Sequence, residues 1–570
     1  MKMRQWMAQY DLWLNKATED CDIAAELKQM AGNETLIADA FYRNLEFGTG
    51  GLRGVMGAGS NRMNLYTVAK ASQGLANYIT AAFARSARAV AIGYDSRVKS
   101  DWFAEVAAGV FAANGITVFI FNELMPTPCL SFAVRQLHCA AGIMITASHN
   151  PAAYNGYKVY GRDGCQITTD AAAQILTEIE RLDIFADVKR CSYTEGIQQR
   201  LINGIPDTLY TAYVEAVKGQ SMLSADVRAD KNAAIVYTPL HGAGLKPVLR
   251  TLRESGYTRV AVVREQEQPD GAFPTCPCPN PELRETLALG IDYARANHAG
   301  LLLATDPDCD RVGVAVGNGE EYTVLTGHET GMLLLDYICA RHQARGTMPA
   351  NPVMIKTVVT ADMAERIAAN YGVKTINVLT GFKFIGEQIG LLEQAGRVRD
   401  FIFGFEESCG YLSGPYVRDK DGVNGALLIC EMFAFYQAQN ISLLEKLEEL
   451  YRAYGYCLHT LYSYAFDGAD GFIKMQQIMQ GLRNGVKSFD SLQVLQCLDY
   501  AQGLDGLPRS DMLKFILENN CSLVVRPSGT EPKLKIYSSI RAHNRENASL
   551  LDMVLGRALR EYMTDVTGAS

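Results

Sequence analysis

The chain has 570 residues, more than one hydrophobic core usually serves, so we expect three or four domains. Its hydrophobic content of 48% and charged content of 20% are typical of a globular protein, and no apolar stretch reaches membrane-spanning length. A net charge of −8 argues against nucleic-acid and anionic-membrane partners, because both require a basic surface. Residues 1–6 lack the apolar core of a signal sequence, and we expect a cytoplasmic protein.

The 14 cysteines are scattered singly and form no Cys-x-x-Cys pair. We therefore expect reduced cysteines in the hydrophobic core and no disulfide framework. Cys276 and Cys278 form a Cys-x-Cys in a Pro-rich stretch. A solvent-side loop is the simpler interpretation of that pair, and a metal or redox role is the alternative.

The predicted elements begin with residues 1–42, which are expected to be mostly helical. Three later segments then share one order: an apolar strand, a polar loop, an amphipathic helix, a glycine and a second strand. They are residues 89–121 with Gly115, residues 233–263 with Gly256, and residues 353–379 with Gly372. In each, the glycine follows the helix, where a left-handed cap costs least. The repeat predicts three similarly built α/β domains.

Beyond about residue 451 the pattern changes. Residues 523–526 and 533–540 are predicted strands joined by a loop, and residues 546–562 are a predicted amphipathic helix. These elements predict a small α+β domain at the C-terminus. We therefore expect four domains, with the boundaries 1–205, 206–322, 323–450 and 451–570.

The first polar segments are a glycine-rich loop and a serine turn. Residues 47–54 carry one cation, Arg53, in a pattern common to many loops. Ser148 follows the apolar run 142–145, stands beside His149 and Asn150, and is followed by Lys158. A serine in a turn is usually only a turn former, and a serine beside a histidine can also be a hydrolase nucleophile, although Gly-x-Ser-x-Gly is absent. The apolar strand and the polar neighbours favour a functional serine.

Three aspartates, Asp306, Asp308 and Asp310, alternate behind a second apolar strand. An EF-hand loop begins in the same way, but it needs Gly and Glu where this chain has Arg311 and Gly317. A solvated acidic loop is the alternative, yet carboxylates set between two apolar runs repel each other without a cation. Alternating Asp oxygens suit Mg²⁺, and a serine that carries a phosphoryl group needs such a cation. Together the two segments predict a phosphoserine and its metal.

Three further segments are polar. Residues 404–410 place Glu406 and Glu407 after an apolar run, where paired acceptors suit vicinal sugar hydroxyls and an exposed turn is the alternative. Residues 416–422 alternate in charge, which usually means a solvated turn, although they can supply a cation to a site. Residues 525–533 combine an Arg fork, two hydroxyls and a glycine, as a phosphate site requires, and a bare turn is the alternative.

Taken in this order, the segments resemble those of the α-D-phosphohexomutase superfamily over nearly the whole chain. Residues 146–151 are similar to its phosphoserine loop, 306–311 to its Mg²⁺ loop, 406–408 to its sugar-binding loop and 526–532 to its phosphate-binding loop. The resemblance implies three similar mixed α/β domains plus a C-terminal α+β domain resembling the TATA-binding-protein fold, arranged around a central cleft. Residues 155–160, 380–383 and 404–408 look most like the phosphoglucomutase and phosphopentomutase branch.

The resemblance also implies an activity and its residues. The expected reaction interconverts glucose 1-phosphate and glucose 6-phosphate through phosphorylated Ser148 and bound glucose 1,6-bisphosphate, with Mg²⁺ as cofactor. The implied catalytic residues are Ser148, Lys158 as general acid/base, His149 and Arg53, and the implied metal ligands are Asp306, Asp308, Asp310 and the Ser148 phosphate. The implied substrate-binding residues are Arg311, Thr380, Gly381, Glu406, Ser408, Lys420, Arg526, Ser528, Gly529 and Thr530.

Several alternatives stay open at this point. A phosphopentomutase acting on ribose 1-phosphate or deoxyribose 1-phosphate would use the same catalytic residues. Phosphomannomutase activity is a second alternative, and a third is a glucose-1,6-bisphosphate synthase, which would load a phosphoryl group from a glycolytic donor and form net bisphosphate. A sugar-phosphate-binding regulator without turnover is a different class, and retention of Ser148, the three aspartates and Lys158 argues against it. The expected partner is a phosphosugar, and we expect a monomer or a homodimer.

Overall fold

The structure is a computed structural model that describes residues 2–48, 50–224, 227–466, 468–504, 506–528 and 533–567. Its chain divides into two compact units, and each is described by itself. The first unit is Met1–Thr326, Phe382–Phe401 and Ser408–Phe435, and the second is Gly327–Gly381, Ile402–Glu407 and Tyr436–Ser570. Among the described helices, none combines the length and apolar character needed to cross a membrane.

The first unit begins with three helices, as predicted: α1 (Lys2–Lys16), α2 (Cys21–Gln29) and α3 (Glu34–Phe41). Asp20 and Asn33 cap α2 and α3 by accepting hydrogen bonds from backbone amides of their first turns. Trp13 of α1 is fully buried and meets the rings of Phe41 and Tyr66 edge to face. This contact packs the N-terminal helices onto the first α/β domain.

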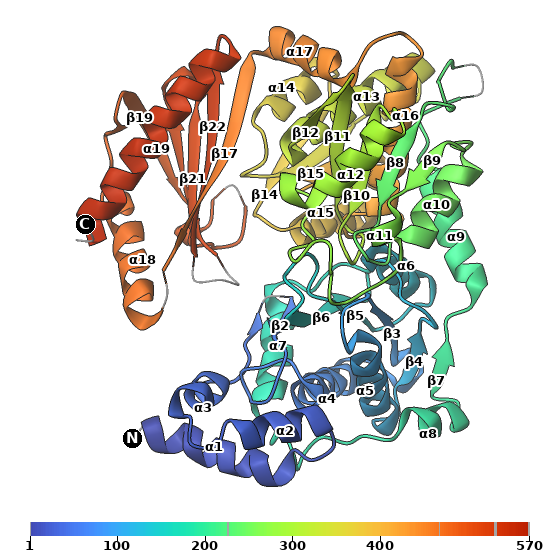
Figure 1. The fold of residues 1–570 in the computed structure, drawn as a ribbon, viewed down its shortest axis with the longest axis vertical. Coiled ribbons are helices and arrows are strands. Elements are labelled where there is room, and N and C mark those ends of the chain that lie inside the picture. Colours follow the sequence, from blue (N-terminus) through green and yellow to red (C-terminus); the bar gives the residue numbers. More distant parts are fainter. Residues whose placement is uncertain are drawn as a thin grey trace. The chain divides into compact units, whose positions relative to one another are not determined.

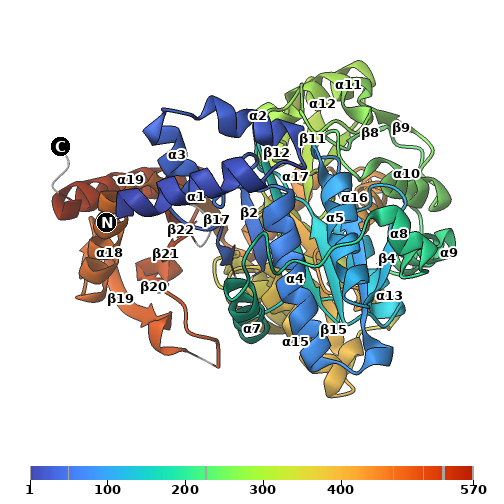
Figure 2. The same ribbon diagram turned by 90° about the horizontal axis from the view of Figure 1, so that it is seen from below.

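A seven-stranded sheet with the order β1-β2-β6-β5-β3-β4-β7 forms the first domain. Its strands are β1 (Phe47–Gly48), β2 (Gly51–Val55), β3 (Ala89–Tyr94), β4 (Thr117–Ile120), β5 (Ala141–Ile145), β6 (Tyr154–Gly161) and β7 (Ile202–Gly204). The parallel strands β3 and β5 are continuous apolar runs because helices cover both faces of the sheet. The helices α4 (Leu65–Ala82), α5 (Ser100–Ala113) and α7 (Thr169–Glu180) cover one face, and α6 (Thr127–Gln136) covers the other (Figure 1). Helices α4 and α5 lie side by side in both views (Figure 2).

The second sheet of this unit has the order β12-β11-β10-β8-β9. Its strands are β8 (Ile235–Thr238), β9 (Val260–Val262), β10 (Leu301–Thr305), β11 (Val312–Asn318) and β12 (Glu321–Leu325). The remaining elements of the unit are α8 (Tyr193–Gln198), α9 (Asp207–Lys218), α10 (Leu245–Glu254), α11 (Arg264–Glu267), α12 (Arg284–Ala296), α15 (Phe382–Gln394), β16 (Gly410–Leu412), α16 (Gly422–Gln437), and the 3₁₀ turns η1 (Arg85–Ala87) and η2 (Val398–Asp400). Strand β10 runs parallel to β8, and its carboxyl end carries the aspartate loop.

The second unit holds two more sheets. In the first, β14 (Lys374–Val378), β13 (Val353–Thr357) and β15 (Phe401–Glu406) are neighbours, accompanied by α13 (Gly327–Arg345), α14 (Met363–Asn370) and α17 (Leu443–Tyr454). The C-terminal sheet has the order β17-β22-β21-β20-β19-β18. Its elements are β17 (Tyr456–Ala465), α18 (Gly468–Arg483), β18 (Ser488–Phe489), β19 (Leu492–Asp499), η3 (Tyr500–Gln502), β20 (Leu513–Leu517), η4 (Glu518–Asn520), β21 (Ser522–Pro527), β22 (Lys533–Ala542) and α19 (Arg545–Thr567). Helices α18 and α19 lie on the same face of this sheet (Figures 1 and 2).

The predicted α/β domains and the predicted C-terminal α+β domain are confirmed, including the repeated strand-helix-strand motif. The pairs β3 and β4, β8 and β9, and β13 and β14 are each parallel, and α5, α10 and α14 connect them. The glycines that end these helices have positive φ angles: 69° at Gly115, 95° at Gly256 and 70° at Gly372. The predicted C-terminal strands and helix are also present, as β21, β22 and α19. The predicted domain boundaries stay a prediction.

The cysteines follow the prediction with three exceptions. All 14, each within the described residues, are free, and most are buried. Cys21 and Cys497 are exposed and so are not core residues. Cys276 is buried, which corrects the predicted solvent-side loop, and the half-buried Cys278 donates its thiol proton to the carbonyl oxygen of His149 at 3.7 Å. Among the residues that the structure describes, neither cysteine belongs to a metal-binding cluster.

Candidate active site

The serine turn joins the end of β5 to the start of β6. Ser148 is only 2% exposed, and its φ angle of 53° lies in the left-handed region, which is uncommon for a residue with a side chain. Its amide donates to Thr146 Oγ1 at 2.8 Å, and that hydroxyl donates to Asp95 Oδ2 at 2.6 Å. The turn is therefore fixed from within the sheet.

Arg97, which the sequence analysis did not single out, holds this turn. Its guanidinium is fully buried and donates to the carbonyl oxygens of Ser148 at 2.7 Å, Pro151 at 3.0 Å and Tyr154 at 2.9 Å. The carbonyl of Asn150 also accepts a hydrogen bond from it. A signal existed: the polar residues 95–97 follow β3, whose parallel neighbour β5 ends in the serine turn. Polar side chains at the carboxyl ends of adjacent parallel strands tend to meet in one site.

The aspartate loop joins β10 to β11, and its three carboxylates are buried. The side chains of Asp306, Asp308 and Asp310 are at most 1% exposed, and each offers an oxygen within 4.8 Å of the others. Asp306 Oδ2 accepts a hydrogen bond from Ser148 Oγ at 2.8 Å, while its Oδ1 accepts from the amides of Asp310 and Arg311. The predicted serine and the predicted metal ligands are thus brought into contact.

In Asp308 and in Asp310, one carboxylate oxygen is in contact with lysine side chains. Asp308 Oδ2 accepts from Lys158 Nζ at 2.7 Å, and Asp310 Oδ2 lies 3.3 Å from Lys158 Nζ and 2.9 Å from Lys420 Nζ. Within the described part of the chain, Asp308 Oδ1 and Asp310 Oδ1 are buried and accept no hydrogen bond. Arg311 Nε lies 3.7 Å from Asp310 Oδ1. Two anionic oxygens without donors, beside a third carboxylate, fit a hard divalent cation.

The pKa shifts of the aspartates also fit a site for a divalent cation. Burial, together with the charges of Asp310 and Asp308, raises the pKa of Asp306 well above its ordinary value. Burial also disfavours the charged form of Asp308, but Lys158 outweighs it and lowers the pKa of that carboxyl. Of the His, Cys, Asp and Glu clusters in the described residues, only this one is wholly buried. The site can therefore accept a cation that relieves the repulsion between its carboxylates.

Lys158 and Lys420 are the cations that face the loop. Lys158 lies on β6 and is 9% exposed; burial opposes its charge, but Asp308 and Asp310 raise its pKa above the ordinary value. Lys420 lies 3.5 Å from Asp419 Oδ1, and Asp419 Oδ2 accepts a hydrogen bond from Tyr160 at 2.7 Å. Residues 418–421 are all buried, so the solvated turn predicted for residues 416–422 is wrong. Each buried charge is retained there because it has a partner.

His149, Arg53 and Arg311 complete the cluster in the first unit. His149 Nδ1 lies 3.3 Å from Ser148 Oγ. Burial, with Arg311 and Arg53, lowers the pKa of His149 well below its ordinary value, so the ring is neutral at physiological pH. Arg53 donates to Asn150 Oδ1 at 3.3 Å, and Arg311 Nε lies 3.8 Å from Asp306 Oδ2. Ser408, also in this unit, is half-buried.

The other predicted substrate-binding residues belong to the second unit. Glu406 is 5% exposed, whereas Glu407 Oε2 accepts hydrogen bonds from the hydroxyls of Thr357 and Thr360. In the same unit, the hydroxyl of Thr380 is buried without a hydrogen-bond partner among the described residues, and Gly381 has a φ angle of 117°.

Arg526 and Ser528 lie at the end of β21 in the C-terminal sheet. Arg526 Nη2 donates to the hydroxyl of Tyr537 at 3.1 Å, and its guanidinium stacks over that ring at 5.7 Å from the centroid. Ser528 N donates to the carbonyl of Lys533 at 2.8 Å. Gly529 and Thr530 lie outside the described residues. The geometry thus fixes the base of the predicted phosphate-binding loop.

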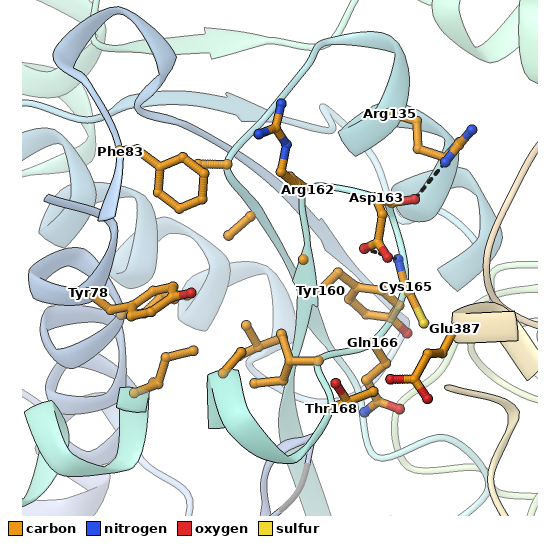
Figure 3. Close-up of a pocket in the computed structure, with 18 of the residues that line it drawn as sticks. Tyr78, Phe83, Arg135, Tyr160, Arg162, Asp163, Cys165, Gln166, Thr168 and Glu387 are labelled. Carbon is orange, nitrogen blue, oxygen red and sulfur yellow. Dashed lines mark hydrogen bonds between the residues drawn. The ribbon is translucent and has the colours of Figure 1, made fainter. Parts of the chain in front are cut away.

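A separate cavity of about 780 Å³ lies in the first unit, between α4, α7, β6 and α15. Figure 3 shows Tyr78 and Phe83 on one side of it and Asp163, Cys165 and Glu387 on the other. Tyr160 lines this cavity with its ring and reaches Asp419 with its hydroxyl. None of the predicted catalytic, metal-binding or substrate-binding residues that the structure describes lines it.

Three family models match the chain. Phosphoglucomutase/phosphomannomutase alpha/beta/alpha domain I matches residues 44–184, domain II residues 211–319 and domain III residues 326–454. The chain is 35% identical over 534 residues to the phosphoglucomutase of Staphylococcus epidermidis, covering 89% of this chain and 95% of the relative. It is 34% identical over 559 residues to the phosphoglucomutase of Staphylococcus aureus, covering 95% and 97% of the two chains.

Solved structures share the fold at lower identity. A phosphoglucomutase/phosphomannomutase family protein from Burkholderia thailandensis superimposes with a TM-score of 0.67 at 19% identity, covering 90% of this chain and 97% of the other. Parafusin from Paramecium, a phosphoglucomutase solved in an open form, has a TM-score of 0.67 at 17% identity, with 93% and 96% of the two chains covered.

Proposed function

Because the chain belongs to the phosphoglucomutase/phosphomannomutase family, we propose that it is a phosphoglucomutase, which interconverts glucose 1-phosphate and glucose 6-phosphate. The observation that carries this is the 2.8 Å contact between Ser148 Oγ and Asp306 Oδ2 inside a buried cluster of three aspartates. Relatives at 34–35% identity over most of the chain support glucose phosphates as the substrates.

In the proposed reaction Ser148 carries a phosphoryl group between the two ends of the sugar. The P–Oγ bond of phosphorylated Ser148 breaks as a hydroxyl oxygen of the monophosphate bonds to the phosphorus, which forms glucose 1,6-bisphosphate; the sugar hydroxyl gives up one proton and Ser148 Oγ gains one. The bisphosphate reverses its orientation, and Ser148 takes back the phosphoryl group from the other end. A site closed to water is required, because water would otherwise hydrolyse the phosphoserine.

Mg²⁺ would be held by Asp306, Asp308, Asp310 and the Ser148 phosphate. When bound, the cation supplies positive charge that neutralises the transferring phosphoryl group. The same positive charge weakens the ion pairs between the carboxylates and Lys158. The contact of Ser148 with Asp306 and the donor-free oxygens of Asp308 and Asp310 support this assignment.

Lys158 is the proposed general acid/base. Its pKa is raised by Asp308 and Asp310, so it begins as an ammonium that can donate a proton to a leaving oxygen. His149 is neutral and lies beside Ser148 Oγ, where it can hold the hydroxyl in place. Arg53 and Arg311 would offset the charge of the phosphoryl group as it moves.

The remaining residues would hold the substrate away from the reacting atoms. Arg526, Ser528, Gly529 and Thr530 would bind the phosphate that does not react, since a guanidinium fork and hydroxyls suit a dianion. Glu406 and Ser408 would accept hydrogen bonds from sugar hydroxyls. Thr380, Gly381 and Lys420 would complete the sugar and phosphate contacts.

A coupled assay tests the proposal. Glucose 1-phosphate, mannose 1-phosphate and ribose 1-phosphate are compared with catalytic glucose 1,6-bisphosphate present, and turnover should be highest on glucose 1-phosphate. Preference for mannose 1-phosphate or ribose 1-phosphate would replace the proposal with a phosphomannomutase or a phosphopentomutase. Net accumulation of bisphosphate from a phosphoryl donor would indicate a bisphosphate synthase.

We also propose that the enzyme works in the cytoplasm on free phosphosugars, with neither nucleic acid nor membrane as a partner. Its net charge of −8 supports this, because a surface without excess positive charge does not attract polyanions. We expect a monomer or a homodimer. Light scattering coupled to size-exclusion chromatography would distinguish them by the molar mass in solution.

A further inference from the structure

Thr127 begins helix α6 and touches the aspartate loop twice. Its backbone amide donates to the carbonyl oxygen of Asp308 at 2.9 Å, and its hydroxyl donates to Asp308 Oδ2 at 2.8 Å. The side chain is fully buried. Asp308 lies 181 residues further along the chain, so these two bonds join the first α/β domain to the second within one unit.

The hydroxyl of Thr127 does not cap its own helix. A threonine at a helix N-terminus usually accepts a hydrogen bond from the first turn. Here the residue before it, Pro126, takes the cap position, and the described residues give α6 no side-chain cap. Pro128 follows directly, and its ring fixes the backbone of this first turn. The Thr127 hydroxyl is therefore directed to Asp308 from a rigid support.

The two oxygens of Asp308 have different surroundings as a result. Oδ2 receives the hydroxyl of Thr127 and the ammonium of Lys158, at 2.8 Å and 2.7 Å. Oδ1 is buried and accepts no hydrogen bond from any residue that the structure describes. A carboxylate held through one oxygen presents the other in a fixed direction.

We infer that Thr127 is a positioning residue for the cation site, where it holds Asp308 so that Oδ1 stays turned to the metal. The inference rests on the proposed function in one respect, that the aspartates bind Mg²⁺. Lys158 also binds Asp308 Oδ2, but its ammonium is shared with Asp310 Oδ2, which lies 3.3 Å away. Thr127 binds Asp308 at two points, because its hydroxyl donates to the carboxylate and its amide donates to the backbone carbonyl of the same residue.

The substitution Thr127→Val tests the hydroxyl by itself. Valine has nearly the same shape, and the backbone bond from residue 127 to the Asp308 carbonyl remains in the variant. Loss of an outer hydrogen bond to a metal ligand typically weakens metal binding by about 10- to 100-fold. We expect that range for Thr127→Val, and near wild-type affinity for Thr127→Ser, which keeps the hydroxyl.

The measurement is Mn²⁺ binding followed by electron paramagnetic resonance, with Mg²⁺ as competitor, on proteins matched for Ser148 phosphorylation by intact mass. Thr238→Val is the matched control: Thr238 is equally buried, and its hydroxyl donates to Gln266 Oε1 at 2.7 Å, not to an aspartate of the loop. The control should keep the wild-type affinity. Thermal unfolding in excess chelator reports whether Thr127→Val changes stability apart from the metal.

Two outcomes separate the inference from the proposed function. Wild-type protein that binds neither Mn²⁺ nor Mg²⁺ removes the metal assignment itself. If the wild type binds the metal and the metal affinity of Thr127→Val is within twofold of the wild-type affinity, the inference is overturned and the metal assignment stands. If Thr127→Val does not fold, Thr127→Ala and Thr127→Ser replace it, and equal metal affinity in those two overturns the inference, because the hydroxyl then makes no difference.

Discussion

The buried guanidinium of Arg97 donates a hydrogen bond to the carbonyl oxygen of Ser148 at 2.7 Å. The same guanidinium reaches three further carbonyls of the turn that follows, and Asp95 lies 3.5 Å from it. Ser148, the proposed carrier of the phosphoryl group, is therefore held in place through its backbone as well as through its hydroxyl.

Arg97→Lys should lower turnover by about 100-fold while the protein stays folded, because an ammonium cannot reach four carbonyls and a small misplacement of a reacting group is costly. Arg88→Lys is the control: Arg88 also donates to two backbone carbonyls, of Phe83 and Thr80, but lies outside the cluster of proposed catalytic and metal-binding residues. Steady-state kinetics and circular dichroism on both variants measure the effect. Equal turnover in the two variants would contradict the role given to Arg97.

Ser148→Ala should reduce turnover by several orders of magnitude. The loss of stability should be modest, about 1 kcal/mol, because one buried hydrogen bond to Asp306 disappears. Intact-mass analysis after incubation with glucose 1,6-bisphosphate should show one phosphate on the wild type and none on the variant. Near wild-type activity in Ser148→Ala would remove the phosphoserine from the mechanism.

Asp308→Asn should impair turnover far more than substrate binding. The amide keeps the size of the side chain but removes one of the charges that would hold Mg²⁺, whereas the substrate contacts proposed in the second unit are unchanged. The check is kcat and KM as functions of Mg²⁺ concentration. Full wild-type activity in excess chelator is the result that would exclude the metal assignment.

Arg526→Ala should raise KM by about 10- to 100-fold, the equivalent of roughly 1.5 to 3 kcal/mol for a charge-assisted pair with phosphate. The kcat should also fall, since binding energy from a remote phosphate contributes to the transition state. Arg526→Lys should recover only part of the loss, because an ammonium lacks the planar fork. Unchanged kinetics in Arg526→Ala would show that residues 526–532 are only a turn.

Two stacked histidines in the second unit should make its stability depend on pH. The rings of His328 and His459 lie 4.1 Å apart. Burial lowers the pKa of His459 to about 4, despite an opposing effect of Asp362. Burial and His459 also lower the pKa of His328 well below its ordinary value. Both rings therefore stay neutral at a pH where the unfolded chain takes up protons.

Stability should consequently fall as the pH drops from about 6.5 toward about 4, by up to about 1.4 kcal/mol per pH unit for each histidine. His459→Phe keeps a stacked ring and removes one titrating group, so the loss of stability between pH 7 and pH 5 should shrink by roughly 2 kcal/mol. Urea unfolding at the two pH values measures it. His138→Gln, at an exposed histidine, is the control, and identical pH dependence in His459→Phe and wild type would refute the prediction.

The parts of the site that could be predicted follow buried parallel strands. Ser148 comes after β5 and Asp306 after β10, and in both places a fully buried strand that begins as an apolar run leads into polar residues. Thr127 could not be found in this way, because its only distinguishing feature is a partner 181 residues away. Sequence patterns report neighbours along the chain, and contacts between domains leave no periodic signal.

The errors have an equally physical origin. Residues 416–422 alternate in charge, which predicts a solvated turn, yet Arg418 pairs with Glu393, and Asp421 accepts hydrogen bonds from two tyrosines. Charges are buried where partners satisfy them, and two of these partners, Glu393 and Tyr213, lie far from the segment in the sequence. The C-terminal strands β17 and β19 are largely half-exposed, so their apolar pattern is weak beside that of β21.

The left-handed backbone of Ser148 also restricts which amino acids could replace it. A φ angle of 53° is unfavourable for a β-branched residue, whose two γ atoms crowd the backbone. Threonine, although it carries the same hydroxyl and is phosphorylated by the same chemistry, would shift the turn away from Arg97. Aspartate tolerates this conformation better, so a permanently charged mimic of the phosphorylated state can be installed at residue 148 without reshaping the loop. The backbone, as much as the chemistry, thus favours serine for the role proposed for residue 148.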